Sequence, residues 1–180
     1  MSNRGDILIT VILIMVGIIL MIFVPLMTIS NTQDDITQVA VHSLVADFVN
    51  NASKKGKITK DDYNDFIAKL TATGNSYDIQ LEHQILTINP NKSETMQVGE
   101  NLSYSEFNTT ILYNEEKGVY GAKGEYLLKK GDYIIATVKN TNKTIGTQLA
   151  NALFSVIGKD VYVIATSASA LVVNTGSYSK

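Results

Sequence analysis

The chain has 180 residues, which suits one domain of ordinary size. Its formal net charge is −2, so it lacks the basic balance that is typical of a nucleic-acid-binding protein. It contains no cysteine, which excludes disulfide bonds, thiol catalysis and cysteine-based metal sites. We therefore expect a domain that is stabilised by its own packing, with no nucleic-acid partner and no cofactor.

The first long segment, Ile7–Met27, contains no charged residue, and only Thr10, Gly17 and Pro25 in it are not large and apolar. As a helix it is about 31 Å long, which matches the roughly 30 Å hydrocarbon core of a bilayer. The sequence therefore predicts a single transmembrane helix. Two alternatives are a buried core helix and a cleavable secretory signal. A signal has a shorter apolar stretch of about 7 to 15 residues, and Thr28-Ile29-Ser30 is a poor cleavage site.

The charges on either side of this segment predict its orientation. Arg4, the only arginine in the chain, precedes the segment, whereas Asp34 and Asp35 follow it before any lysine appears. The positive-inside rule then places the N-terminus in the cytoplasm. We expect residues 1–30 to form a short cytoplasmic leader and a transmembrane helix. Residues 31–180 would form an extracytoplasmic domain.

Residues 31–53 continue the helical pattern as an amphipathic extension. We expect the membrane helix to run on, with a bend at Pro25, to about Ala52. The apolar stripe of this extension needs a partner, which is either the chain's own sheet or another subunit. Within the bilayer, a glycine permits the close approach of a neighbouring helix. The candidate residues for helix packing and assembly are Gly17, Ile36, Ala40, Leu44 and Phe48.

A second helix is predicted from its end signals. Thr59 is a good N-cap, Asp61 and Asp62 lie in the first turn, and Gly74 ends the helix. The residues of its apolar face are Tyr63, Phe66, Ile67 and Leu70.

A strand follows this helix, because Tyr77, Ile79 and Leu81 alternate with polar residues. The phase then slips to Leu86 and Ile88. This slip predicts a bulged strand or a short hairpin.

The middle of the chain reads as a loop, a short helix and a hairpin. The loop is polar and covers Asn89–Glu100, and Ser105–Asn114 could form the helix. Strands over Glu125–Lys129 and Tyr133–Lys139 would flank the turn Lys130-Gly131-Asp132.

The last part of the chain predicts a helix and a strand. Apolar residues recur at helical spacing from Ile145 to Val156, and Gly158 follows them. Val161–Val173 reads as a long apolar strand that is too short for a second membrane span. The order of elements predicts an α+β fold, with helices packed on a mainly antiparallel sheet.

The sequence shows no catalytic or metal-binding pattern. His42 and His83 have no partner at metal-ligand spacing, and we expect both to be surface or packing residues. The acidic pairs Asp61-Asp62 and Glu115-Glu116 are adjacent in sequence, so their side chains point apart. We predict no catalytic, cofactor-binding or metal site and no enzymatic activity.

The plan of the chain resembles the pilin-like class of bacterial surface proteins. A short leader ends in Arg4-Gly5, an uninterrupted apolar segment starts at Ile7, and the helix extends into an α+β domain. Within this class the chain most resembles the TadE-like minor pseudopilins of tight-adherence pili and related Gram-positive membrane proteins. The segments Leu128–Tyr133 and Val161–Val173 are also similar.

The resemblance implies leader-peptide processing between Gly5 and Asp6. It also implies two kinds of partner, the lipid bilayer and other pilin-like subunits or pilus-assembly membrane proteins. Members of the class usually carry a glutamate five residues after the processed glycine, where this chain has Thr10. An accessory protein that is not processed therefore stays open as an alternative.

The expected function is that of a structural or accessory subunit of a bacterial surface appendage, in the cell membrane or in a surface pilus. The alternative is a monomeric, membrane-tethered binding or sensor domain. An enzyme with a site that the sequence does not display is a further alternative. A deep pocket in which several titratable groups converge would favour it.

Overall fold

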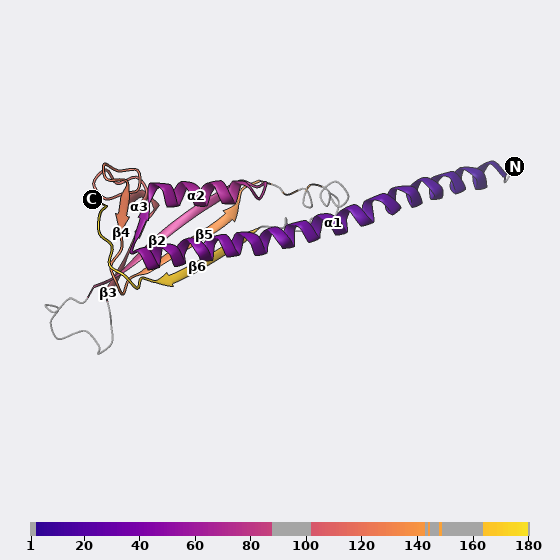
Figure 1. Ribbon diagram of the computed structural model, residues 1–180. Helices are drawn as coiled ribbons and strands as arrows, with labels where there is room; N and C mark the ends of the chain where they lie inside the picture. The colour runs from indigo at the N-terminus through magenta and orange to yellow at the C-terminus, as the bar shows by residue number, and fades with distance from the viewer. Residues whose placement is uncertain (1–2, 88–101, 143, 145–147, 149–163, 180) are drawn as a thin grey trace. The chain divides into compact units, whose positions relative to one another are not determined.

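The computed structural model describes residues 3–87, 102–142, 144, 148 and 164–179 (Figure 1). The chain divides into two compact units. The first unit consists of Met1–Thr37 and Lys143–Tyr162, and the second consists of Gln38–Asn142 and Val163–Lys180. Helix α1, Asn3–Lys55, contributes residues to both units.

Helix α1 is 53 residues long and continues through Pro25 without interruption. The predicted extension of the apolar helix to about Ala52 is therefore confirmed. Lys54 and Lys55 lie in its last turn, where cations complement the negative end of the helix dipole. Gly56 follows with a φ of 68°, a left-handed conformation that suits glycine and ends the helix.

In the first unit, α1 carries buried polar side chains just after its apolar segment. Ser30, Asp34 and Thr37 are each no more than 7% exposed. The hydroxyl of Thr144 donates a hydrogen bond of 2.7 Å to the Asp34 carboxylate, which satisfies part of the buried acid.

The second unit contains two antiparallel sheets and two further helices. The larger sheet has the strand order β3-β2-β5-β6, with bounds β2 Tyr77–Thr87, β3 Leu102–Phe107, β5 Tyr133–Asn140 and β6 Ala165–Leu171. The smaller sheet pairs β1, Lys57–Thr59, with β4, Glu125–Leu127. The helices are α2, Lys60–Thr71, and the short α3, Asn108–Ile111. The predicted α+β class is confirmed.

The core of this unit is built from α1, α2 and one face of the larger sheet (Figure 1). Alternate residues of β2 and β5, such as Leu81, Ala136 and Val138, are fully buried. Phe48 of α1 stacks on Phe66 of α2 with ring centroids 4.4 Å apart. Truncating a buried aromatic side chain of this kind costs about 3–5 kcal/mol, so this pair fixes the two helices against each other.

The predicted start of the second helix is confirmed. Thr59 accepts a hydrogen bond of 3.1 Å from the backbone N–H of Asp62, and the Asp62 carboxylate accepts from the backbone N–H of Thr59. This reciprocal arrangement is a capping box. Tyr63, Phe66 and Leu70 then face the core as expected.

The predicted bulge or hairpin in the segment after α2 is wrong for the residues that the structure describes. β2 is one strand, and it pairs with β5 in unbroken register from Tyr77↔Asn140 to Gln84↔Tyr133. The apolar alternation is interrupted because a polar residue, His83, takes an inward position of the strand and is buried there.

The predicted hairpin around Lys130-Gly131-Asp132 is also wrong. The turn forms, and Gly131 adopts a φ of 97°, but β4 pairs with β1, whereas β5 pairs with β2 and β6. The N–H of Leu128 donates to the carbonyl of Gly56 at 2.8 Å, which holds the end of β4 beside the turn after α1. The turn therefore joins two sheets.

Two strands have no counterpart in the sequence analysis. β1 has only three residues, and β3 occupies residues that were expected to start a helix, so the predicted helix Ser105–Asn114 shortens to α3. The final strand is confirmed for Ala165–Leu171. The predicted loop Asn89–Glu100 and the predicted helix after Ile145 lie outside the described residues, apart from Gln148.

Candidate functional site

The N-terminal half of α1 exposes its apolar side chains. Met21 is 81% exposed and Leu13 is 65% exposed. By length and composition, α1 is the one candidate membrane span among the residues described. The hydroxyl of Thr10, the only polar side chain in the apolar segment, donates to the carbonyl of Asp6 at 2.8 Å and is thereby satisfied inside the helix.

The predicted assembly residues fall into two groups along α1. Gly17, Ile36 and Ala40 are exposed, and a Cβ added to Gly17 would meet no atom within 4 Å. Leu44 is half-buried, and Phe48 is only 6% exposed because it packs in the core. The C-terminal end of the apolar stripe, at Leu44 and Phe48, is therefore covered by the chain's own fold. The glycine and aspartate of the possible processing site, Gly5 and Asp6, are both exposed.

A series of hydrogen-bonded polar side chains lies in the second unit, and three of its four members are buried. β2 places His83 on the inner face of the sheet, opposite Glu106 of β3. His83 Nε2 lies 3.0 Å from the Asp132 carboxylate, and His83 Nδ1 lies 2.7 Å from the hydroxyl of Tyr126. The Tyr126 hydroxyl also donates to Glu106, whose other oxygen accepts from Lys117 Nζ at 2.5 Å. We call Asp132, His83, Tyr126 and Glu106 the His83 chain.

Burial and charge act in opposite directions on the His83 chain. Burial lowers the pKa of His83, and the Asp132 carboxylate opposes this, with the net shift downward. Burial raises the pKa of Glu106, but hydrogen bonds from Lys117 and Tyr126 outweigh it, so the net shift is also downward. Both directions favour a neutral imidazole and an ionised Glu106 at neutral pH.

A cavity of about 210 Å³ adjoins the side chains of the His83 chain, and Lys129 and Tyr178 also line this cavity. Several titratable groups therefore converge, as the enzyme alternative requires. However, His83 and Asp132 are each 3% exposed and Tyr126 is 2% exposed, so their polar atoms face one another. The volume is below the roughly 300 Å³ at which small-molecule pockets usually begin. The hydrogen bonds within this cluster join strands of both sheets.

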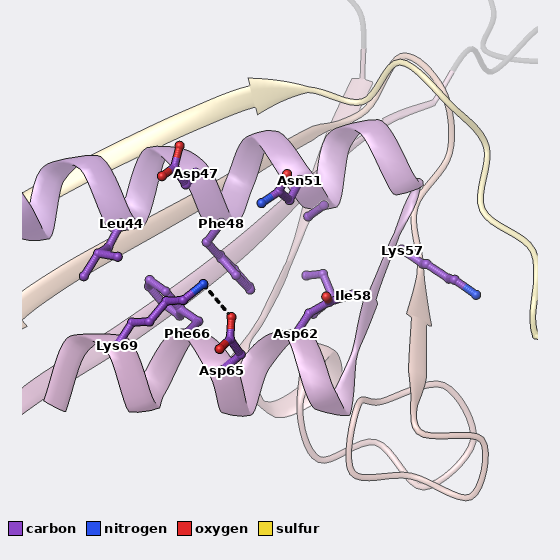
Figure 2. A pocket seen from close by; sticks show the side chains of 11 residues that line it. Leu44, Asp47, Phe48, Asn51, Lys57, Ile58, Asp62, Asp65, Phe66 and Lys69 are labelled. Carbon is purple, nitrogen blue, oxygen red and sulfur yellow. Dashed lines mark ion pairs between the residues drawn. The ribbon is translucent and has the colours of Figure 1, made fainter. Parts of the chain in front are cut away.

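A second hollow lies between α1 and α2 (Figure 2). Leu44 and Phe48 of α1 and Phe66 of α2 line it, and Figure 2 shows the ion pair between Lys69 and Asp65, 2.7 Å long, beside these side chains. Its volume is only about 70 Å³, enough for a few water molecules.

The C-terminal segment is held against β1 and β4. Glu125 accepts hydrogen bonds from the hydroxyl and the backbone N–H of Ser179 at 2.6 and 3.0 Å, and from Lys57 Nζ at 3.0 Å. The Ser179 hydrogen bonds lower the pKa of Glu125 to about 2, with a further contribution from Lys57. These hydrogen bonds hold Ser179 beside Glu125 and Lys57, and we call this cluster the clamp.

His83 lies in the strand that the sequence predicts, but its partners cannot be recognised from the sequence. Tyr126 and Asp132 lie 43 and 49 residues further along the chain, so no spacing rule connects them. The signal that was present is the polar residue at an inward strand position, because a buried polar group requires partners.

Over the described parts of the chain, no group of three or more acidic or histidine side chains is placed to hold a metal ion. His42 is exposed and lies 2.8 Å from the hydroxyl of Thr166.

Comparison with known proteins found no matching family model, no matching curated protein and no matching solved structure.

Proposed function

We propose that this protein is a membrane-anchored structural or accessory subunit of a bacterial surface appendage, and that the apolar half of α1 is its anchoring and assembly element. The observation that carries this proposal is the exposure of that half. It belongs to a helix whose C-terminal turns are buried in a folded domain. The resemblance of the chain's plan to pilin-like proteins supports the same role.

The composition of Ile7–Met27 favours insertion into a bilayer. Fifteen of its residues are Ile, Leu, Val or Phe. Each favours insertion by about 0.3 to 0.6 kcal/mol, so together they favour a bilayer by roughly 7 kcal/mol. The segment therefore requires an apolar environment, which a bilayer or the helices of other subunits would supply.

The first experiment determines the N-terminus of the mature protein by mass spectrometry of the membrane fraction. A chain that starts at Asp6 would support processing and entry into an appendage. A chain that starts at Met1 or Ser2 would favour the unprocessed accessory protein. Recovery of the full chain in the soluble fraction would refute the membrane anchor.

A second experiment separates a subunit from a monomeric sensor. Because the chain has no cysteine, single cysteines can be introduced as cross-linking probes. We expect Gly17→Cys to form disulfide-linked dimers in the membrane, and we expect Ala68→Cys, on an exposed position of α2, to serve as the control. Equal and low cross-linking of both variants would favour the monomeric sensor.

A further inference from the structure

The His83 chain connects the two sheets of the second unit. His83 lies on β2 and Glu106 on β3 of the larger sheet, whereas Tyr126 lies on β4 of the smaller sheet. Asp132 comes from the turn between β4 and β5, and it also accepts a hydrogen bond from the backbone N–H of Lys129 at 3.2 Å. Tyr126 therefore links the sheets through two contacts, one to His83 and one to Glu106.

The hydrogen atoms available to the four side chains of the His83 chain show that their contacts depend on protonation. Three contacts join the four side chains in the order Asp132, His83, Tyr126 and Glu106, and each needs a hydrogen between its two polar atoms. Two ionised carboxylates, a neutral imidazole and a phenol bring only two hydrogens, the imidazole N–H and the phenol O–H. The third hydrogen requires one more proton.

We propose that the contact between His83 and Tyr126 is a proton-dependent link between the two sheets, closed when the imidazole is protonated and released when it is neutral. In the protonated form, Nε2–H donates to Asp132, Nδ1–H donates to the Tyr126 oxygen, and the Tyr126 hydroxyl donates to Glu106. In the neutral form, Nε2–H stays on Asp132. The Tyr126 hydroxyl stays on Glu106, because a hydrogen bond to an ionised acceptor is the stronger one.

The charges around the link set the pH at which it closes. Asp132 and Glu106 favour the imidazolium, Lys117 opposes it, and Lys129 and Tyr178 line the adjoining cavity. On β2 itself, Glu82 points to the opposite face of the sheet. Since burial is the largest influence and lowers the pKa of His83, the link closes below the ordinary pH range of histidine. The inference does not depend on the membrane or appendage role.

Nitrogen-15 NMR of the imidazole rings in the full chain in detergent micelles tests the link. The chain has only two histidines, so exposed His42 is an internal control in the same spectrum. At neutral pH we expect His83 as the Nε2–H tautomer, and at acidic pH we expect both of its nitrogens to be protonated. A His83 that is in the Nδ1–H tautomer at neutral pH overturns the proposal.

Tyr126→Phe provides the matched variant, because it keeps the aromatic ring and removes the hydroxyl that accepts from Nδ1–H. We expect the titration midpoint of His83 to fall by about half to one pH unit, the equivalent of one lost hydrogen bond, with His42 unchanged. If this variant does not fold, Glu106→Gln replaces it. Its amide can donate to the Tyr126 oxygen, which frees the hydroxyl for neutral His83, and together with the loss of the Glu106 charge this lowers the midpoint. An unchanged midpoint in the folded variant overturns the proposal.

Discussion

The backbone segments at Gly56 and Gly176 cross in close contact, and this crossing allows a sharp test of the fold. A Cβ on Gly176 would lie 2.0 Å from the carbonyl oxygen of Gly56, far inside van der Waals contact, so Gly176→Ala forces one backbone to move by about 1 Å. At the same crossing, Gly176 N–H donates to the carbonyl of Leu128 at 2.9 Å, and Leu128 N–H donates to Gly56 at 2.8 Å. Overpacking costs about 1–3 kcal/mol, and each weakened hydrogen bond costs about 1 kcal/mol. We expect a loss of about 2 to 5 kcal/mol.

The assay is urea unfolding of the full chain in detergent micelles, followed by tyrosine signals, since the chain has nine tyrosines and no tryptophan. Gly74→Ala is the matched control. Gly74 has a φ of 83° but nothing within 4 Å of an added Cβ, so its substitution introduces only backbone strain of about 1–2 kcal/mol. Equal losses in the two variants, or no loss in Gly176→Ala, would refute the reasoning from steric contact.

Three further predictions concern the second unit and α1. Glu125 has a pKa of about 2 against an ordinary value of 4.5, so the stability that it contributes is present above pH 4.5 and lost as the pH falls towards 2. Glu125→Gln should flatten that part of the curve of unfolding free energy against pH, and a curve like that of the unsubstituted protein would contradict the clamp. Phe48→Ala should lower the unfolding free energy by about 3–5 kcal/mol, whereas Ile36→Ala, at a position that is 58% exposed, should change it by less than about 0.5 kcal/mol in urea titrations. Thr59→Ala should cost about 1 kcal/mol through the lost cap of α2, and a change near zero would show that the capping box is not formed in solution.

Local signals explain the parts of the fold that could be predicted. The long helix follows from the unbroken apolar run and the amphipathic stripe behind it, and both are read over neighbouring residues. Thr59 and Asp62 satisfy each other across three positions, so the start of α2 is visible in the sequence. The turn at Gly131 is equally local. The pairing of the two strands that this turn connects is not determined locally, because β4 and β5 pair with strands elsewhere in the chain.

The strands and the polar cluster needed information from distant positions. β1 has three residues and becomes a strand only because Ile58 pairs with Tyr126 across the smaller sheet. β3 carries too few apolar residues to be recognised by alternation, and its pairing with β2 defines it. His83 looked like an ordinary packing residue because its partners are far away in sequence.

The sequence by itself determined the long apolar helix, the capped second helix and the α+β class. Each of these depends on hydrogen bonds and hydrophobic periodicity within a few residues. Only the tertiary structure decided which strands pair, which part of the α1 stripe is covered and which groups surround His83. The physical reason is that these contacts join residues tens of positions apart, and their energies depend on burial that exists only once the sheets and helices have packed.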